Sequence, residues 1–305
     1  MERIINYKIT GQNTPITVGA FLHERGISHR ILVCLKNTPR GIMKNGAWAR
    51  TNETLAEGDI LTIRLLDESS SEHIPAWEHP LDILYEDEDL IVINKEAGLP
   101  VHPSQGHYGT TLANALAYHF EQRSEPFIFR AVSRLDKDTS GVIVIAKNML
   151  SGAILSSMVA ERKIHRRYTA IVSGKTEKSG TVSLPIARKD ASVIERCVDR
   201  EHGEYACTHY RRLAYAPEID CSQLLLQLET GRTHQIRVHM KAIGHPLPGD
   251  FLYNPDFRLI GRQALHSWHV SFPHPITGEA MEFTAPLPED FKFFKPLEKN
   301  FPSIF

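Results

Sequence analysis

The stretch "AVSRLDKDTSGVIVIAK" (residues 131–147) places an arginine and two aspartates directly before five consecutive apolar residues. The apolar run Val142–Ala146 predicts a buried strand. The order Asp-Thr-Ser-Gly from Asp138 onward is typical of a turn, so Asp138 has an evident structural task. Asp136 has none, and a carboxylate beside a buried strand needs a cation or hydrogen-bond donors. From this stretch alone, Asp136 is either a second turn residue or a reactive group.

Strand patterns dominate the chain on both sides of this stretch, and helix patterns stand between them. We expect strands at 83–85, 90–94 and 168–174, in "SQLLLQLETG", in "ALHSWHVSF" and in "AMEFTAP". We expect helices in "TTLANALAYHFEQ" with Thr111 as N-cap, in "SGAILSSMVAERK" with Ser151 as cap, and in "THQIRVHMKAIGHP". In the strand 168–174, alternation puts Tyr168, Ala170 and Val172 on one face. The irregular order of strands and helices predicts an α+β fold with a mixed or antiparallel sheet.

A polar segment divides the chain into two unequal parts. The segment "LDESSSEHIPAWEHP" (66–80) carries serines and two prolines and predicts a linker. We therefore expect a small domain at 1–68, a linker at 69–80 and a larger domain at 81–305. In the small domain, "TVGAFLHERG" predicts a helix that Gly26 ends, and "RILVCLKN" a second short helix. The pair Asn45-Gly46 predicts a β-hairpin.

The composition is that of a folded protein with an uneven distribution of charge. The chain has 305 residues, 42% hydrophobic content and a net charge of -1. It has no apolar run of the roughly 20 residues that a membrane span needs, and its N-terminus lacks a signal-peptide pattern. The four cysteines are scattered, which favours free thiols in the cytoplasm. The segment 82–89 is acidic and 162–167 is basic, as expected of a protein that meets a polyanion on one face. A solvated charged surface is the alternative.

Two distant segments supply groups that suit a site around Asp136. The segment "ETGRTHQIRVH" ends a strand and places Arg237 one turn into a helix, where it is either a partner for a carboxylate or a surface charge. The segment "RRYTAIVSG" puts Tyr168 after the basic run. Basic residues beside an aromatic ring are typical of nucleic-acid binding, although a Tyr at a strand end also packs over a core.

Other chemistries lack a motif in the sequence. His234 and His239 are five residues apart and so point to different sides of a helix, and no HExxH or paired CxxC spacing occurs. There is no nucleophile elbow, Walker loop or dinucleotide glycine pattern. We therefore expect no metal, and we expect neither an NTPase nor an NAD enzyme.

Five segments in the same order resemble the RluA/RluD-type family of pseudouridine synthases. They are "ILYEDEDLIVINKEAGLPVHPS", "SRLDKDTSGVIVIAK", "RRYTAIVSG", "GRTHQIRVHMKAIGHPLPGDFLY" and "ALHSWHVSFPHPITGE". The resemblance runs from about Leu81 to the C-terminus. The small domain is similar, more loosely, to the alpha-L RNA-binding domain through "NGAWARTNETLAEGDIL". The chain departs from the family at Ser133, Asn254 and Ser267, where the family usually has His, Gly and Ala.

The resemblance implies an enzyme that isomerises uridine to pseudouridine in ribosomal or transfer RNA, with no metal and no cofactor. It implies that Asp136 is the nucleophile, that Arg134 occupies the place of the flipped uridine, and that Arg237 pairs with Asp136. It further implies stacking of Tyr168 on the uracil and an apolar wall from Leu265. The turn hydroxyls of Thr139 and Ser140 can donate hydrogen bonds that fix the turn. Contacts to the RNA backbone are expected from Arg162, Lys163, Arg166 and Arg167.

Two other functions remain open from the sequence. The first is a non-catalytic RNA-binding or ribosome-assembly protein on the same fold, although a mere binder has no need of Asp136, Tyr168 and Arg237 together. The second is a histidine-metal hydrolase. We expect a cytoplasmic monomer that binds RNA and no membrane.

Overall fold

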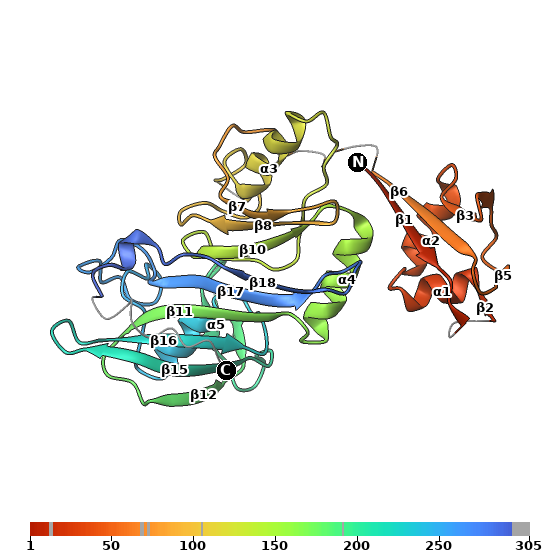
Figure 1. Cartoon of the computed structure of the whole chain (residues 1–305). Coiled ribbons are helices and arrows are strands. Elements are labelled where there is room, and N and C mark those ends of the chain that lie inside the picture. Colours follow the sequence, from red (N-terminus) through yellow and green to blue (C-terminus); the bar gives the residue numbers. More distant parts are fainter. Residues whose placement is uncertain (12–14, 68–69, 72–73, 105, 191, 295–305) are drawn as a thin grey trace.

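A mixed sheet of ten strands, counted among the described residues, forms the larger part of the molecule (Figure 1). The structure is a computed structural model that describes residues 1–11, 15–67, 70–71, 74–104, 106–190 and 192–294. Three positions of the predicted linker, 69 and 72–73, lie outside the described residues, as do residue 68 of the small domain and the end of the larger domain at 295–305. The predicted domain boundaries stay a prediction.

The sheet is antiparallel except at its centre. Its strands follow the order β12 (Ser179–Ser183), β15 (Cys207–Ala216), β16 (Cys221–Leu228), β11 (His165–Ser173), β17 (Leu265–Pro273), β10 (Ser140–Ala146), β8 (Leu90–Lys95) and β7 (Ile83–Glu86). At its margins β18 (Ala280–Thr284) pairs with β17, and β9 (Arg130–Ala131) pairs with β10. Among the strands that the structure describes, the pair β10–β17 alone is parallel. The prediction of an α+β fold with a mixed or antiparallel sheet is confirmed.

Three helices accompany the sheet: α3 (Leu112–Glu121), α4 (Met149–Ala160) and α5 (Gln235–Ala242). Thr111 caps α3 as predicted. The predicted cap of α4 is wrong, because Asn148 and not Ser151 accepts the first backbone N–H groups. Asn is as good an N-cap residue as Ser, and Asn148 stands two residues after the end of β10. The helix therefore begins three residues earlier than predicted. Ser151 instead lies buried in the first turn and donates to Asp89. No described helix combines the length and the apolar character that a membrane span requires.

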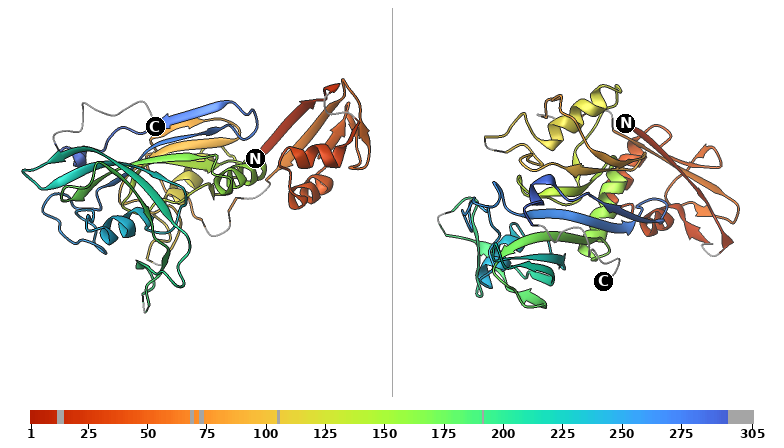
Figure 2. Two further views of the ribbon diagram at one scale, coloured as in Figure 1. Left: turned by 90° about the horizontal axis from the view of Figure 1, so that it is seen from below. Right: turned by 60° about the vertical axis from the view of Figure 1, so that its left-hand side comes forward.

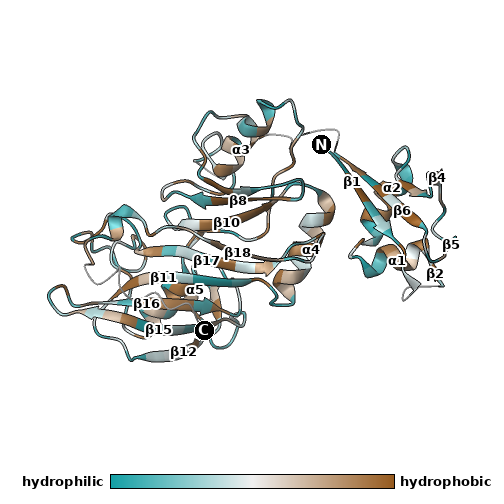
Figure 3. Cartoon of the chain, viewed as in Figure 1, coloured by the Kyte–Doolittle hydropathy of each residue, from teal (hydrophilic) through white to brown (hydrophobic). Residues whose placement is uncertain are grey.

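The central strands are buried on both faces. Every residue of β10 is buried, and Figure 3 shows the apolar residues concentrated in such strands. Tyr168, Ala170 and Val172 share one core cluster, as their alternation in β11 predicted. The peripheral strands were not predicted, because their residues are polar or half-exposed: β12, β15, β13 (Ile186–Arg188) and β14 (Arg196–Val198).

Gly141 allows the parallel pair at the centre of the sheet to form. It follows the turn and has a φ of +108°, and it pairs with Ser267 of β17. A Cβ atom at this position would lie 2.1 Å from the carbonyl oxygen of Ser267. Only glycine combines this φ with so close an approach to another backbone. The glycine of "DTSG" therefore sets how closely β10 approaches β17.

The N-terminal part has its own sheet and core. The sheet runs β1 (Glu2–Lys8), β6 (Ile60–Leu66), β3 (Ile42–Lys44) and β4 (Ala47–Trp48), and it is accompanied by α1 (Val18–Glu24), α2 (His29–Asn37) and the short pair β2 (Ile16–Thr17) and β5 (Thr54–Leu55). The two predicted helices are present. The predicted hairpin joins β3 and β4, with Asn45 and Gly46 at φ of 50° and 81°. β1 was not predicted.

The N-terminal part contacts the larger sheet through α4, which lies between them in Figures 1 and 2. Leu150 of α4 belongs to the apolar core of the N-terminal part. Arg3 of β1 donates to both oxygens of the buried carboxylate of Asp89, at 3.0 and 2.8 Å. Apolar burial and a bidentate ion pair therefore hold the two parts together.

We expect Gly141→Ala to reduce the free energy of unfolding by at least about 3 kcal/mol, because it adds a backbone clash to an unfavourable φ. Gly278→Ala is the matched control: its φ is +75°, and no atom lies within 4 Å of the added Cβ. The control should cost only about 1–2 kcal/mol. Urea unfolding of both variants measures the difference, and equal losses would contradict the close-approach explanation.

Candidate active site

The loop that carries Asp136 joins β9 to β10 and ends in a tight turn. The amide of Thr139 donates to the carbonyl of Asp136 at 3.1 Å. Beneath the loop, the ammonium group of Lys95 from β8 donates to the carbonyl of Lys137 at 2.9 Å and to that of Leu99 at 2.9 Å. Burial lowers the pKa of Lys95 to about 7. The lysine thus anchors the residue next to Asp136 to the central sheet.

The other side of the turn is held from the segment that leads into β17. Arg262 donates to the carbonyl of Asp138 at 2.9 Å. The hydroxyl of Ser140 contacts the ring Nδ1 of His266 at 2.9 Å. The Thr139 hydroxyl accepts from the amide of Gln263 at 3.4 Å, whereas the sequence suggested that it donates. The turn is therefore braced through its side chains as well as its backbone.

Arg237 of α5 joins Asp136 to a second carboxylate. Its NH1 group donates to Oδ2 of Asp136 at 2.8 Å, which is the pairing that the sequence predicted. Its Nε and NH2 groups donate to the two oxygens of Asp250 at 2.6 and 2.8 Å. The side chains of Arg237 and Asp250 are 2% and 0% exposed, whereas that of Asp136 is 25% exposed. Asp136 alone of the three reaches solvent.

The buried cation stays charged because its partners outweigh its burial. Burial alone would lower the pKa of Arg237, but the hydrogen bonds and charges of Asp250 and Asp136 raise it overall. The ring of Tyr253 lies beneath the guanidinium, 5.0 Å from its central carbon. The planar guanidinium group has N–H donors on two edges and can bind two carboxylates at once, whereas the single ammonium group of a lysine lacks this geometry.

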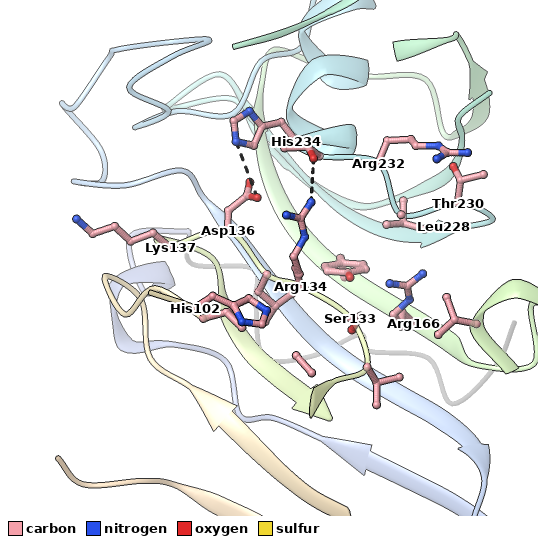
Figure 4. A pocket seen from close by; sticks show the side chains of 18 of the residues that line it. His102, Ser133, Arg134, Asp136, Lys137, Arg166, Leu228, Thr230, Arg232 and His234 are labelled. Carbon is pink, nitrogen blue, oxygen red and sulfur yellow. Dashed lines mark hydrogen bonds and ion pairs between the residues drawn. The ribbon is translucent and has the colours of Figure 1, made fainter. Parts of the chain in front are cut away.

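His234 stands on the other side of Asp136, with its Nε2 4.0 Å from Oδ1 (Figure 4). Burial lowers the pKa of His234, against the opposing effect of Asp136. It is therefore mostly neutral near pH 7, and its Nδ1 contacts the hydroxyl of Tyr253 at 3.0 Å. Arg237 is thus the principal countercharge of Asp136.

The side chains predicted for catalysis and substrate binding line one recess. Its lining includes Arg134, Asp136, Thr139, Tyr168, Arg237 and Leu265. The recess shares Asp136 and Tyr168 with a wider cavity of about 980 Å³. Tyr168 and Leu265 are each 5% exposed and supply its apolar surface, and Arg134 is exposed and donates to Thr233 at 3.1 Å. The arrangement suits a planar ring next to a carboxylate, with charged groups at the entrance.

The predicted basic residues divide into two groups. Arg162 and Arg166 line the wider cavity, whereas Lys163 and Arg167 lie outside its described lining. Arg162 is paired with Glu229 at 2.8 Å. Arg166 and Tyr168, two residues apart on β11, both line this cavity, and the pairing of β11 with β17 has a bulge between Arg167 and Tyr168.

The histidines that invited a metal hypothesis have separate partners. His239 contacts Thr208 and the carbonyl of Leu184, and His245 contacts the carbonyl of Ser173. None of His234, His239 and His245 belongs to a ligand cluster among the described residues. These three histidines therefore give the metal hypothesis no support in the part of the chain that the structure describes.

Three supporting residues were missed from the sequence: Lys95, Asp250 and Arg262. Asp250 lies in the segment "GDFLY", which entered the sequence analysis only through the family resemblance. No expected strand or helix adjoins this segment, so no local pattern pointed to Asp250. A buried lysine at the end of an apolar strand, in "IVINK", was the available signal for Lys95, because such a charge needs several acceptors.

Several known proteins are similar to this chain in sequence or in fold. A family model described as RNA pseudouridylate synthase matches residues 89–242. The uncharacterized RNA pseudouridine synthase YjbO of Bacillus subtilis (strain 168) is 44% identical over 276 residues, which cover 90% of this chain and 96% of that protein. The ribosomal large subunit pseudouridine synthase D of Zymomonas mobilis is 36% identical over 299 residues, covering 90% and 93%. The solved structure of human RNA pseudouridylate synthase domain containing 1 is 28% identical, has a TM-score of 0.56 and covers 70% of this chain and 85% of its own.

His266 makes the stability of this site sensitive to acid. Burial lowers its pKa from about 6.5 to about 4. Because the unfolded chain binds this proton more readily, the contribution of His266 to stability is present above about pH 6.5 and is lost toward pH 4. We expect a loss of about 2 kcal/mol between about pH 7 and pH 5. Urea unfolding at both pH values should show a smaller loss for His266→Gln and an unchanged loss for the exposed control His23→Gln. If the wild type and His266→Gln lost equal stability between the two pH values, His266 would not be the group responsible for the acid sensitivity.

Proposed function

The chain belongs to the RNA pseudouridylate synthase family, and from this premise we propose that it isomerises specific uridines of ribosomal RNA with Asp136 as nucleophile. As a member of the family it is an RNA pseudouridine synthase, an intramolecular isomerase. Ribosomal RNA is favoured over transfer RNA because several relatives are named for the large ribosomal subunit.

The ion pair between Asp136 and Arg237 is the observation that carries the nucleophile assignment. A nucleophilic carboxylate has to be ionised, aimed and accessible, and Asp136 has a buried cation at 2.8 Å and a partly exposed side chain. Asp138, two residues further on, lies outside the described lining of the recess. The surroundings of Asp136 therefore favour it over Asp138 as the reacting group.

We infer a double displacement at the ribose carbon C1′. An oxygen of Asp136 bonds to C1′ while the C1′–N1 bond breaks, and its electron pair leaves with the uracil. The uracil turns within the recess, and its carbon-5 then bonds to C1′ and displaces the carboxylate. The proton on carbon-5 is lost and N1 gains one, so the product is an isomer of the substrate. Tyr168 and Leu265 suit the containment of the free base, and the Tyr168 hydroxyl is our candidate acceptor for the carbon-5 proton.

The target uridine has to leave its stack before Asp136 can reach its ribose carbon. Arg134 is exposed at the entrance and donates one hydrogen bond within the described part of the chain, to Thr233, so we propose that it fills the space that the uridine vacates. Arg162 and Arg166, and with less support Lys163 and Arg167, are proposed to contact RNA phosphates. We propose that residues 1–68, joined by the linker 69–80 to a catalytic domain at 81–305, form an alpha-L-like RNA-binding domain. We further propose a cytoplasmic monomer.

We expect Asp136→Asn to abolish tritium release from RNA labelled at carbon-5 of uridine, by at least about a thousandfold, because the neutral amide is a poor nucleophile. RNA binding should persist. Asp138→Asn is the matched control from the same turn and should retain most activity. If Asp136→Asn were as active as the wild type, the nucleophile assignment would fail. If only Asp138→Asn lost activity, the nucleophile would have to be assigned to Asp138.

The substrate is identified by mapping pseudouridine at single-nucleotide resolution in strains with and without the gene. The proposal predicts sites that disappear from ribosomal RNA. If sites were lost only from transfer RNA, transfer RNA would be the substrate in place of ribosomal RNA. If no site were lost, the non-catalytic RNA-binding alternative would be favoured.

The contact of Arg166 with RNA phosphate predicts a change in salt dependence. Removing one phosphate contact should make the slope of log affinity against log salt shallower by about 0.7–0.9. Filter binding of labelled RNA at several salt concentrations should show this for Arg166→Gln. The exposed control Lys292→Gln lies outside the described lining of the cavity and should keep the wild-type slope. Equal slopes for all three proteins would place Arg166 away from the RNA.

A further inference from the structure

Three potential metal ligands meet where the hairpin of β15 and β16 reaches the cavity wall. Cys207 and His209 are two residues apart on β15, so their side chains lie on the same face of the strand. Glu229 directly follows β16, and its amide donates to the carbonyl of Cys207 at 3.2 Å. The strand pairing therefore brings together a thiol, an imidazole and a carboxylate that are up to 22 residues apart in the sequence.

The three ligand atoms are spaced like the corners of a metal coordination site. Sγ of Cys207 lies 3.8 Å from Nε2 of His209 and 3.4 Å from Oε1 of Glu229, and these last two atoms are 2.8 Å apart. Tetrahedral zinc, with bonds of about 2.3 Å to sulfur and about 2.0–2.2 Å to nitrogen or oxygen, separates its ligands by about 3.3–3.6 Å. Shifts of about half an ångström would complete such a site.

We propose that Cys207, His209 and Glu229 bind a zinc-class divalent metal ion, with the fourth coordination position open. Sulfur and imidazole nitrogen select such ions over magnesium and calcium, which prefer oxygen ligands. This site goes beyond the uridine isomerisation, which takes no step through it, and it does not rest on the proposed substrate.

The groups behind the ligands are already arranged as they are in metal sites. The second ring nitrogen of His209, Nδ1, contacts the hydroxyl of Thr181 at 2.9 Å. The second oxygen of Glu229, Oε2, accepts from Arg162 at 2.8 Å, which leaves Oε1 directed at the thiol and the imidazole. Such outer contacts orient ligands, and their loss weakens metal binding. The contacts of Arg162 and Thr181 therefore support the ligand assignment independently of the ligand spacing.

Without a metal ion, the Cys207 thiol donates to Oε1 of Glu229 at 3.4 Å. A metal ion has to take the place of this proton, because the thiolate is the ligand. The side chains of His209 and Glu229 are 38% and 29% exposed, which gives an ion access from solvent.

The site lies on the wall of the same cavity as Asp136, because Glu229 and its neighbour Tyr205 belong to the lining of that cavity. The metal would hold Glu229 and, through it, Arg162 in fixed positions. Another cluster of potential ligands, Asp87, Asp89 and His274, is less suitable, since Arg3 already neutralises Asp89.

Cobalt(II) titration of the full chain, after removal of metals with a chelator, provides the main test. Co²⁺ should bind with a thiolate charge-transfer absorption band, and added Zn²⁺ should remove it. The band should be absent in Cys207→Ser and unchanged in Cys34→Ser, the control for a free and exposed thiol. Absence of the band in the wild type, or its persistence in Cys207→Ser, would overturn the proposal.

Two surface variants test the site without altering the buried thiol. Thr181→Val removes the hydroxyl that contacts Nδ1 of His209 and should weaken Zn²⁺ binding by about 10–100-fold. Unchanged binding would show that this contact does not support His209 as a metal ligand. Zn²⁺ should raise the Tm of the wild type, because the assembled site binds it more tightly than the unfolded chain does, and should not raise that of His209→Gln. An equal rise in Tm for both proteins would place the metal elsewhere. These readouts need no RNA, so a failure here leaves the isomerase assignment intact.

Discussion

The guanidinium group that Arg237 shares between Asp136 and Asp250 is the constraint on which the site depends. Burying this cation costs several kcal/mol, and Asp250 repays much of that cost with two hydrogen bonds. This arrangement uses two edges of the planar group and leaves NH1 directed at Asp136. Replacing Arg237 would leave the fully buried Asp250 without its cation. The position of Asp136 is thus fixed by the same ion pair that the surrounding fold needs in order to be stable.

The rest of the fold holds the loop that meets this cation. Lys95 fixes the backbone at Lys137 from β8, and Arg262 fixes it at Asp138 from the opposite side. Gly141 lets β10 approach β17 closely enough for these contacts to form. A carboxylate held from three elements of the core keeps its position, and such preorganisation suits the nucleophilic role that we propose for Asp136.

Local patterns in the sequence were sufficient to predict the elements that carry the site. The apolar run predicted β10, and the helical spacing of apolar residues predicted α5. The family resemblance predicted the pairing of Asp136 with Arg237. Asp250 and Arg262 were not predicted, because their partners are 13 and 124 residues away in the sequence and no local pattern indicates them. The strands β12 and β15 were missed for another reason, since their polar faces hide the alternation of a buried strand.

Ser133 stands where the resemblance to the family predicts a histidine, which raises the question of whether this side chain helps to hold the loop. Ser133 is half-buried and lines the cavity, one residue before Arg134. The described contacts that position Asp136 come from Arg237, Lys95 and the backbone of Thr139, and none of them passes through residue 133. A serine is smaller and stays uncharged, so it leaves more room beside Arg134 without removing a group that holds the carboxylate. The described contacts that hold Asp136 therefore come from the sheet, from α5 and from the turn itself, and they do not depend on the side chain of residue 133.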